Sequence, residues 1–453
     1  MRTNSLPDIE RAIHQLLQGP KYPDREFVRS GSTFGEVYAM ASWLRTELVE
    51  PGYKKAAVCL AADSKAIMAA ALLASLGGGP ALLLPYAFSA NTLARMQQET
   101  GFTTAISDVV RKFPPGVKII CPQLRGFSEI PANTQTLSRP ELLKIFTGGS
   151  TGSPQVWSKT AENIFSEGFY LANRYEITEQ DCILATIPPY HIYGLLFSVV
   201  LPLLSSAAVV GKIPSFPNEI VGAAQEHKVT ILAGVPAHYR VLRGKTISLR
   251  LAFSSAGMLA EEDSEAFSVQ NETGVVEVYG STETGGIATR NRYLGERFFT
   301  PFSTIDWKIM GHHLAVRSPY ISPDLPVDGD GFFTVNDRVE AHGTSKFALK
   351  GRTDMVTKVG GKRVDLEEIR ALIKNESGVM DCVVMALPEA GGREHRIGVL
   401  IQSCRKETDT IKKTLIDALE PYALPRRIKI VDRIPVNDNG KYDWQTITHL
   451  LDR

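Results

Sequence analysis

The sequence predicts an α/β protein with a large N-terminal α/β lobe, residues 1–350, and a small mobile α+β C-terminal lid, residues 351–453. Three observations lead to this prediction. Short β-rich runs alternate with helical patterns over most of the chain, as they do in parallel sheets covered by helices. A stretch rich in Pro, Asp and Gly interrupts this alternation near residues 320–335. A chain of 453 residues with 43% hydrophobic composition is also too long for one ordinary domain.

The elements expected in the large lobe alternate between strand and helix. The patterns predict a strand at 56–60, a helix at 64–76, a strand at 81–84, a helix near 91–100, and further strands at 182–186, 207–210 and 230–234. The stretch from Ala66 to Leu84 is almost wholly apolar, but Gly77-Gly78-Gly79-Pro80 divides it into halves that are each too short to cross a bilayer. We therefore expect a buried helix, a turn and a strand there, and no stable membrane insertion.

The lid is expected to contain both helices and strands. After Arg352 the patterns predict a hairpin and a helix whose apolar stripe includes Leu366, Ile369 and Leu372. Strands at 382–385 and 397–401 and a helix near 410–419 follow. A segment of this size and order is typical of a small α+β unit joined to a larger body by a short hinge.

Charge and cysteine content exclude several classes of partner. Lys and Arg total 50 against 49 Asp and Glu, so no global field favours nucleic acid or an anionic membrane, and we expect a small molecule or a protein as partner. Five cysteines, odd in number and far apart, indicate neither a disulfide framework nor a zinc site; buried thiols in a reducing compartment are expected. The first eight residues lack the basic-then-apolar order of a secretory signal, which favours a cytoplasmic location.

A glycine- and hydroxyl-rich turn is the first candidate for a binding function. It consists of Thr147, Gly148, Gly149, Ser150, Thr151 and Gly152. Closely spaced glycines let backbone N–H groups approach an anion, and the hydroxyls add further donors, so the turn suits phosphate oxygens. An ordinary Gly/Ser surface turn has the same composition. The turn matches neither the Walker pattern nor the Gly-x-Gly-x-x-Gly dinucleotide pattern, which weakens the P-loop ATPase, kinase and Rossmann dehydrogenase interpretations.

Further segments follow this loop in a characteristic order. They are Tyr279-Gly280-Ser281-Thr282-Glu283, Asp337, Gly351-Arg352-Thr353-Asp354 running into Lys358-Val359-Gly360-Gly361, and Gly440-Lys441. With them, the chain resembles the adenylate-forming ligase superfamily, which includes acyl- and aryl-CoA synthetases, peptide-synthetase adenylation domains and beetle luciferases. The resemblance implies ATP-dependent activation of a small carboxylic acid to an acyl-adenylate with release of pyrophosphate. It also implies transfer of the acyl group to the thiol of CoA or of a carrier-protein phosphopantetheine, with an acyl carrier protein as the partner in the second case.

The chemistry of this reaction suggests roles for several residues. An oxygen of the acid must attack the α-phosphorus while pyrophosphate leaves, so several anionic groups have to be held together. The glycine-rich loop suits the β- and γ-phosphates. Glu283, beside Thr282, suits Mg²⁺, because magnesium sites combine one or two carboxylates with substrate phosphates. Asp337 can accept both ribose hydroxyls and Arg352 can donate to ribose or phosphate, although halves of surface ion pairs would look the same.

The resemblance implies the remaining roles. Tyr279 stacks on adenine within the nucleotide-binding segment that also contains Val278, Gly280 and Ser281, while Glu277 and the turn Ser255-Ala256-Gly257 approach the adenine edge. Lys441 bridges the carboxylate and the α-phosphate, and Gly360 and Gly361 line the entry of the thiol after the lid rotates. A simple strand end for the tyrosine segment and a solvated loop charge for Lys441 are the alternatives.

The segment from Pro188 to Gly194 resembles the one that lies against the substrate ring in aryl-acid ligases. Its His191 and Tyr193 could stack on or hydrogen-bond to an aromatic acid such as a hydroxybenzoate, and His191 joins Lys441, Glu283 and Thr282 as a catalytic candidate. A buried histidine satisfied by backbone groups is the alternative. An aromatic acid is therefore favoured.

The chain departs from the family pattern at two places. Gln155 stands where the family usually has Lys after the proline of the loop, with the next lysine at Lys159, and Val335-Asn336 replaces the usual Thr-Gly before Asp337. A phosphate-contacting charge is therefore missing or relocated. Two alternatives to an acid:thiol ligase stay open: an adenylating ligase with a non-thiol acceptor, and a non-catalytic nucleotide-binding homologue. Because Glu283, Arg352 and Lys441 remain along with the ribose candidate, an active enzyme is favoured.

Overall fold

The computed structural model describes residues 9–48, 57–123, 141–147, 155–352, 356–359, 362–388, 395–404, 408–419, 421–437 and 442–452. These residues form two compact units. The first contains the described residues up to 307 together with 316–333, and the second contains 308–315 and the described residues from 334 onward. The predicted α/β class is confirmed, whereas the domain boundary expected between residues 350 and 351 stays a prediction.

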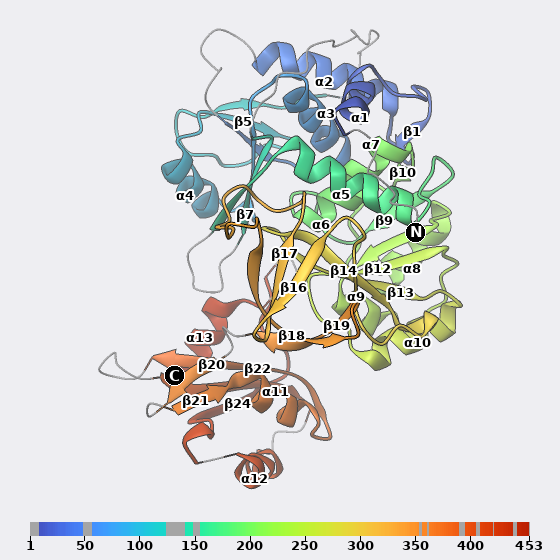
Figure 1. The fold of residues 1–453 in the computed structure, drawn as a ribbon. Helices are drawn as coiled ribbons and strands as arrows, with labels where there is room; N and C mark the ends of the chain where they lie inside the picture. The colour runs from blue at the N-terminus through green and yellow to red at the C-terminus, as the bar shows by residue number, and fades with distance from the viewer. Residues whose placement is uncertain are drawn as a thin grey trace. The chain divides into compact units, whose positions relative to one another are not determined.

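One sheet of the first unit runs in the order β15-β14-β13-β12-β11-β9-β10-β1-β2 (Figure 1). Its strands are β1 (Glu26–Val28), β2 (Ser32–Thr33), β9 (Cys182–Ala185), β10 (Ala208–Val209), β11 (Ile231–Gly234), β12 (Leu251–Ser254), β13 (Val275–Ser281), β14 (Gly285–Asn291) and β15 (Thr300–Pro301). From β13 to β1 the neighbours are parallel, and β2, β14 and β15 join antiparallel at the edges. The carboxyl ends of the parallel strands therefore meet at one edge.

The other sheet of the first unit carries the strand that leads into the glycine-rich loop. It runs in the order β6-β5-β3-β4-β7-β8. Its strands are β3 (Val58–Ala61), β4 (Leu82–Leu84), β5 (Thr104–Ser107), β6 (Lys118–Ile120), β7 (Leu143–Thr147) and β8 (Gln155–Lys159). All neighbours are parallel except β7 and β8, which form an antiparallel pair. The strands expected at 56–60 and 81–84 are confirmed with small shifts of their ends.

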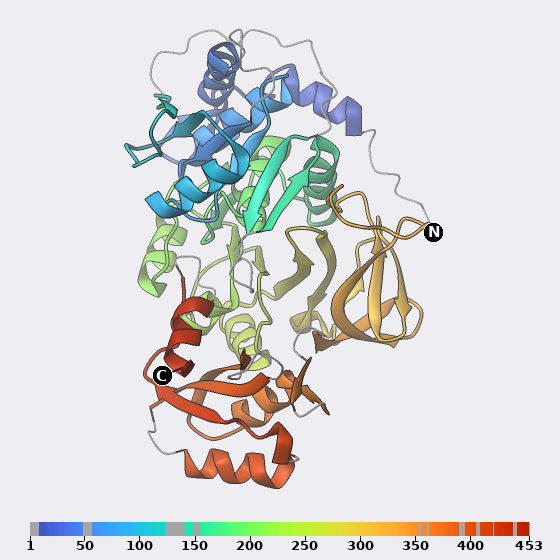
Figure 2. The ribbon, with the colours of Figure 1, turned by 90° about the vertical axis from the view of Figure 1, so that its left-hand side faces the viewer.

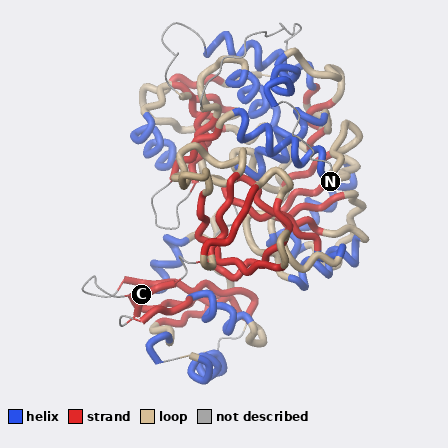
Figure 3. The backbone as a smooth tube through the Cα atoms, viewed as in Figure 1, coloured by secondary structure: helices blue, strands red, loops and turns tan. Residues whose placement is uncertain are grey.

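Helices lie against these strands, as the blue and red segments of Figure 3 show. They are α1 (Ile9–Leu17), α2 (Phe34–Leu48), α3 (Lys65–Leu76), α4 (Ala90–Thr100), α5 (Ala161–Arg174), α6 (Ile192–Leu195), a π-helical turn (Leu196–Val200), α7 (Leu201–Ser205), α8 (Pro217–Glu226), α9 (Pro236–Val241) and α10 (Glu261–Asn271). In the part of the chain that the structure describes, no helix combines the length and apolar character needed to cross a membrane.

Helix α3 is the buried helix that the apolar stretch predicts. Every residue from Lys65 to Leu76 is buried, and the Ser64 hydroxyl caps the helix by accepting the N–H of Ile67. The chain then turns sharply: a Cβ on Gly79 would lie 2.7 Å from the carbonyl oxygen of Ala74, so only glycine fits there. The buried side chain of Lys65 donates to the carbonyl oxygens of Val210 and Lys212, and burial lowers its pKa to about 7.

The cysteines only partly match expectation. All are free thiols, and Cys59, Cys182 and Cys382 are buried as expected. Cys121 and Cys404 are exposed, so the prediction of buried thiols is wrong for these two. Cys121 follows the edge strand β6 and Cys404 follows the last strand residue Ser403, where packing ends on each sheet.

The second unit is built around β22 (Val379–Pro388), β23 (His395–Ser403) and β24 (Arg427–Val431). Side chains on one face of β22 pack with α11 (Leu366–Lys374) and α12 (Asp409–Ala418), and those on the other face pack with α13 (Trp444–Asp452). The ribbon in Figure 2 shows α12 and α13 on opposite sides of these strands. The predicted stripe is confirmed, because Leu366 and Ile369 are buried and Leu372 packs against them.

The remaining strands of this region form a sheet and a hairpin. The sheet has the order β16-β17-β18-β19 and the hairpin pairs β20 with β21. Their bounds are β16 (Asp306–Met310), β17 (His313–Arg317), β18 (Phe333–His342), β19 (Lys346–Arg352), β20 (Val356–Val359) and β21 (Lys362–Asp365). The expected hairpin after Arg352 is therefore confirmed.

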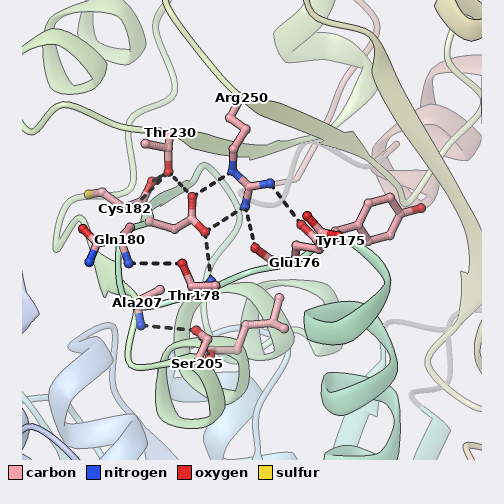
Figure 4. Close-up of polar contacts among 11 residues, drawn as sticks. Tyr175, Glu176, Thr178, Gln180, Cys182, Ser205, Ala207, Thr230 and Arg250 are labelled. Carbon is pink, nitrogen blue, oxygen red and sulfur yellow. Dashed lines mark hydrogen bonds and ion pairs between the residues drawn. The ribbon is translucent and has the colours of Figure 1, made fainter.

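A buried carboxylate joins the amino ends of three parallel strands of the first unit. Asp181, just before β9, accepts from the hydroxyl of Thr230 at 2.7 Å, from the N–H of Thr178 at 3.0 Å and from Arg250 at 2.7 and 3.1 Å. Figure 4 shows these contacts of Thr178, Thr230 and Arg250. Arg250 also donates to the carbonyl oxygens of Tyr175 and Glu176, which ends helix α5 against the same cluster.

Replacing this carboxylate should destabilise the first unit. We expect Asp181→Ala to lower the free energy of unfolding by about 2–3 kcal/mol, because a buried N–H and hydroxyl lose their acceptor. The exposed ion pair of Asp306 with Arg317 supplies the control, and Asp306→Ala should cost less than about 0.5 kcal/mol. Urea unfolding of both variants measures the difference; equal losses would contradict a special role for Asp181.

Candidate functional site

The carboxyl edge of the parallel strands carries most of the predicted residues of the first unit. The turn Ser255-Ala256-Gly257 follows β12, and Val278 to Ser281 form the end of β13. The Ser255 hydroxyl donates to the carbonyl oxygen of Val278 at 2.9 Å, so the structure brings these two predicted segments side by side. Ala256 has a φ of 67°, which turns the chain away from the sheet and leaves Ala256 and Gly257 exposed.

Thr282 and Glu283 form the tip of the hairpin between β13 and β14. The hydroxyls of Ser281 and Thr284 lie 2.8 Å apart, and the N–H of each residue donates to the hydroxyl of the other at 3.2 Å. These contacts close the turn from both sides. The side chains of Thr282 and Glu283 are half-buried at its tip.

Lys159, the last residue of β8, buries its ammonium against this hairpin. It is 1% exposed, and its Nζ donates to the carbonyl oxygens of Tyr320 at 2.6 Å and of Glu283 at 3.1 Å. Burial lowers the pKa of Lys159 to about 8, and the charge of Glu167 opposes this shift. Gln155, at the other end of β8, is exposed. Lys159 therefore does not restore the charge that Gln155 removes from the loop.

Glu167 of α5 brings a second buried charge to the same place. Its Oε1 accepts the N–H of Gly286 at 2.9 Å, and burial raises its pKa while Lys159 and that N–H oppose the rise. Gly285 has a φ of 69°, and a Cβ there would lie 2.6 Å from Cβ of Tyr320 and 2.8 Å from Oε2 of Glu167. Glycine at position 285, two residues after Glu283, is thus required by the groups packed against it.

Glu277 is engaged within the protein. On β13 it faces Arg290 of β14, whose guanidinium binds both carboxylate oxygens at 3.0 and 2.9 Å, and Arg292 donates to Oε1 at 2.5 Å. The carboxylate is therefore shared between two arginines, and its proposed approach to adenine stays a prediction. The nearby ring of Tyr279 lies 5.9 Å from the ring of Phe299. Sequence reasoning missed the two arginines, although cross-strand pairing in a hairpin could have indicated them.

Thr147 ends β7 at the base of the glycine-rich loop. It pairs with Gln155 across the β7–β8 hairpin, and its hydroxyl donates to the carbonyl oxygen of Gln155 at 3.3 Å. Gly148, Gly149, Ser150, Thr151 and Gly152 lie outside the described residues.

The ring-binding candidates follow β9. His191 is half-buried with its ring 4.7 Å from that of Tyr190, and Tyr193 packs edge-on against Phe197 at 5.1 Å. Burial raises the pKa of Tyr193 well above its ordinary value, and a contact of its hydroxyl with the backbone N–H of Gly234 opposes this rise. That contact is poorly aligned, and the hydroxyl has no other partner among the described residues. A Cβ on Gly194 would lie 2.0 Å from the carbonyl oxygen of Pro188, so glycine is needed for α6 to begin here.

A histidine that sequence reasoning missed lies on the same edge. Nδ1 of His238, in α9, accepts the N–H of Val235 at 3.3 Å and lies 2.7 Å from the hydroxyl of Thr186, which follows β9. Burial lowers the pKa of His238 to about 4, so the ring is neutral and carries its proton on Nε2. Its place just after β11, at the carboxyl edge of parallel strands, was the signal that could have found it.

The second unit carries the ribose candidates. Asp337 of β18 stands opposite Arg352 of β19 in the antiparallel register, so the structure brings these two positions together. Asp337 is half-buried. Gly360, Gly361 and Lys441 lie outside the described residues, and their roles stay predictions.

Comparisons with known proteins identify the family of the chain. A sulfoacetate–CoA ligase of Cupriavidus necator is 22% identical over 72% of this chain and 71% of its own. A p-hydroxybenzoic acid–AMP ligase of Mycobacterium tuberculosis is 26% identical over 65% of this chain and 47% of its own. The o-succinylbenzoate CoA synthetase of Bacillus subtilis, solved with ATP and magnesium, has the same fold, with a TM-score of 0.78 at 17% identity over 98% and 99% of the two chains. The family model of AMP-binding enzymes matches residues 17–320. The chain therefore belongs to the AMP-binding enzyme family of adenylate-forming ligases.

Proposed function

We propose that this protein is an ATP- and Mg²⁺-dependent ligase that converts an aromatic carboxylic acid into its acyl-adenylate and then into a CoA thioester. One observation chiefly supports the proposal. The carboxylate of Glu283 lies at the tip of a hairpin that is closed by the hydroxyls of Ser281 and Thr284, beside the carboxyl edge of parallel strands. Ligand sites of open α/β sheets lie at this edge.

The described residues fit Mg²⁺ better than a metal with an all-protein site. Among them, no group of three His, Cys, Asp or Glu side chains gathers to hold a metal ion. Mg²⁺ needs no such group, because one or two carboxylates with substrate phosphates suffice, and Glu283 with the Thr282 hydroxyl supplies hard oxygens. When bound, Mg²⁺ would neutralise charge on the phosphates.

The chain's own groups would then orient the reactants. The acid's oxygen forms a bond to the α-phosphorus while the bond from that phosphorus to the bridging oxygen breaks, and pyrophosphate takes the electron pair. The N–H groups from Thr147 to Gly152 would hold the leaving phosphates, and Lys441 would neutralise charge between acid and α-phosphate. Asp337 and Arg352, opposite each other on β18 and β19, would hold the ribose.

Aromatic side chains favour a ring as the substrate's body. The ring centroid of Phe197 lies 5.1 Å from that of Tyr193 and 4.8 Å from that of Phe253. Packed aromatic rings therefore connect the helical segment after β9 to β12. A buried phenol hydroxyl whose hydrogen bonding is incomplete costs free energy, and the Tyr193 hydroxyl has only a poorly aligned contact with the backbone N–H of Gly234. The hydroxyl of Tyr193 would recover this free energy by bonding a polar substituent on the acid. A relative whose name specifies p-hydroxybenzoic acid supports the same class of acid.

The first test is acid-dependent exchange of labelled pyrophosphate into ATP, over a panel of benzoates, cinnamates and aliphatic acids. We expect exchange with one class of ring acid, and we expect Lys441→Ala to reduce it by about 100-fold or more. The variant also excludes a contaminating enzyme as the source of exchange. Silence across the panel, with ATP binding confirmed by calorimetry, would favour the non-catalytic alternative.

Product analysis with the active acid then identifies the acceptor. With CoA, holo carrier protein and hydroxylamine offered separately, we expect thioester formation to be fastest with CoA. Thioester with the carrier protein alone would indicate phosphopantetheine as the acceptor, and hydroxamate without any thioester would indicate a non-thiol acceptor.

Tyr193→Phe should change which ring acid is preferred. We expect kcat/KM for a hydroxybenzoate to fall about 10-fold, since one hydrogen bond is lost, while that for benzoate is maintained. Tyr239→Phe is the matched control, because the Tyr239 hydroxyl already donates to the carbonyl oxygen of Phe253 at 2.6 Å. We expect this variant to leave the ratio of kcat/KM for hydroxybenzoate to that for benzoate unchanged. A ratio unaltered by both substitutions would remove Tyr193 from the acid pocket.

A further inference from the structure

The backbone of Glu283 is held by two donors from separate segments. Its carbonyl oxygen accepts Nζ of Lys159 at 3.1 Å and the N–H of Ser322 at 2.7 Å. A carbonyl oxygen has two lone pairs, so both acceptor positions are used. The peptide that follows Glu283 is therefore fixed in orientation, while the carboxylate remains half-buried on the same residue.

The segment that supplies the second donor is itself tied to the region around Lys159. Asn163 of α5 donates to the carbonyl oxygen of Pro319 at 2.6 Å, and the N–H of Ser158 donates to Asp324 at 2.6 Å. The carbonyl oxygen of Tyr320 accepts Lys159 directly at 2.6 Å. Residues 319–324 therefore act as a strap that is fixed to β8 and α5 and reaches the hairpin tip at Glu283.

A buried ammonium costs more free energy than an apolar side chain of similar size. Burying a charge costs free energy, and well-packed apolar residues often replace buried ionic groups without loss of stability. What an ammonium adds at this position is direction, because it donates to two carbonyl oxygens from residues 124 and 161 positions away in the sequence. The carboxyl group of Glu167, on α5, opposes the lowering of the Lys159 pKa by burial.

We propose that Lys159 is a positioning residue for adenylation: by holding the carbonyl oxygen of Glu283, it fixes the turn that presents the Glu283 carboxylate to Mg²⁺. This inference rests on the proposed function, in which Glu283 is the magnesium ligand. Loss of the ammonium frees one side of the Glu283 peptide while the hydroxyls of Ser281 and Thr284 still close the turn. The loss should therefore change the Mg²⁺ dependence of the reaction more than the stability of the fold.

The experiment compares Lys159→Met with Lys65→Met. Lys65 is the matched control, because its ammonium is also buried and also bonds two backbone carbonyl oxygens, at the end of β10. Three strands separate β10 from β13 in the sheet, so the control lies about 19 Å from the hairpin by strand spacing. Both variants lose a buried charge, but only one loses contact with Glu283.

Pyrophosphate exchange is measured against free Mg²⁺ at a saturating level of the active acid. For Lys159→Met we expect the Mg²⁺ concentration for half-maximal exchange to rise about 10-fold and the maximal rate to fall about 10- to 100-fold. For Lys65→Met we expect an unchanged Mg²⁺ dependence. Lys159→Gln, which keeps a donor without the charge, should lie between wild type and Lys159→Met, and it replaces the methionine variant if that variant does not fold.

Calorimetry of ATP binding with and without Mg²⁺ separates the two levels of inference. If the wild type neither binds ATP nor exchanges pyrophosphate, the proposed function fails, whatever Lys159 does. If the wild type is active and Lys159→Met keeps both its Mg²⁺ dependence and its maximal rate, the positioning role of Lys159 is overturned. Equal shifts in Lys65→Met would overturn it as well, since they would reflect general loss of stability.

Discussion

The buried ammonium of Lys159 constrains the arrangement around the hairpin tip. A lysine has donors and no acceptor, so its burial requires acceptor groups to be brought to it. Here the carbonyl oxygens of Glu283 and Tyr320 meet that need, and segments far apart in the sequence have to converge on one point. Glycine at position 285 follows from the same packing, because Glu167 and Tyr320 occupy the space that a side chain there would need.

The parallel sheet separates structural and chemical groups between its two edges. At the amino edge, Asp181, Thr230 and Arg250 precede β9, β11 and β12 and satisfy one another's polar groups. At the carboxyl edge, the Tyr193 hydroxyl lacks a well-aligned hydrogen bond, and the Thr186 hydroxyl lies against the neutral ring of His238. Parallel strands produce this division because all their amino ends lie at one edge of the sheet and all their carboxyl ends lie at the other. Stability can therefore be secured at one edge without constraining the chemistry of the other.

The sequence was informative where local patterns decide structure. The buried helix α3 and the amphipathic stripe of α11 follow from hydrophobic periodicity and from breakers such as Gly79, and the order of the motifs led to the family. It was less informative where distant segments meet. In the sequence, Lys159 resembles a displaced loop lysine because its partner, Glu283, is far away along the chain. Glu277 likewise resembles a group available for adenine because the two arginines that bind it come from the other side of the hairpin. Burial of individual cysteines likewise depends on where each strand ends, which composition does not reveal.

The position of Lys159 shows that it does not replace the positive charge that is missing at Gln155. An exposed Gln155 at the mouth of the loop contributes no charge, and the ammonium of Lys159 is committed to backbone carbonyl oxygens. In the proposed reaction, neutralisation of the phosphates would then depend more heavily on Mg²⁺ and on Lys441. Under that demand, a small error in the position of the Glu283 carboxylate is costly, since catalysis by charge depends on preorganised geometry. In the proposed function, a lysine that fixes the Glu283 backbone would thus offset the absence of a lysine that touches phosphate, although its own ammonium is bound to the carbonyl oxygens of Glu283 and Tyr320.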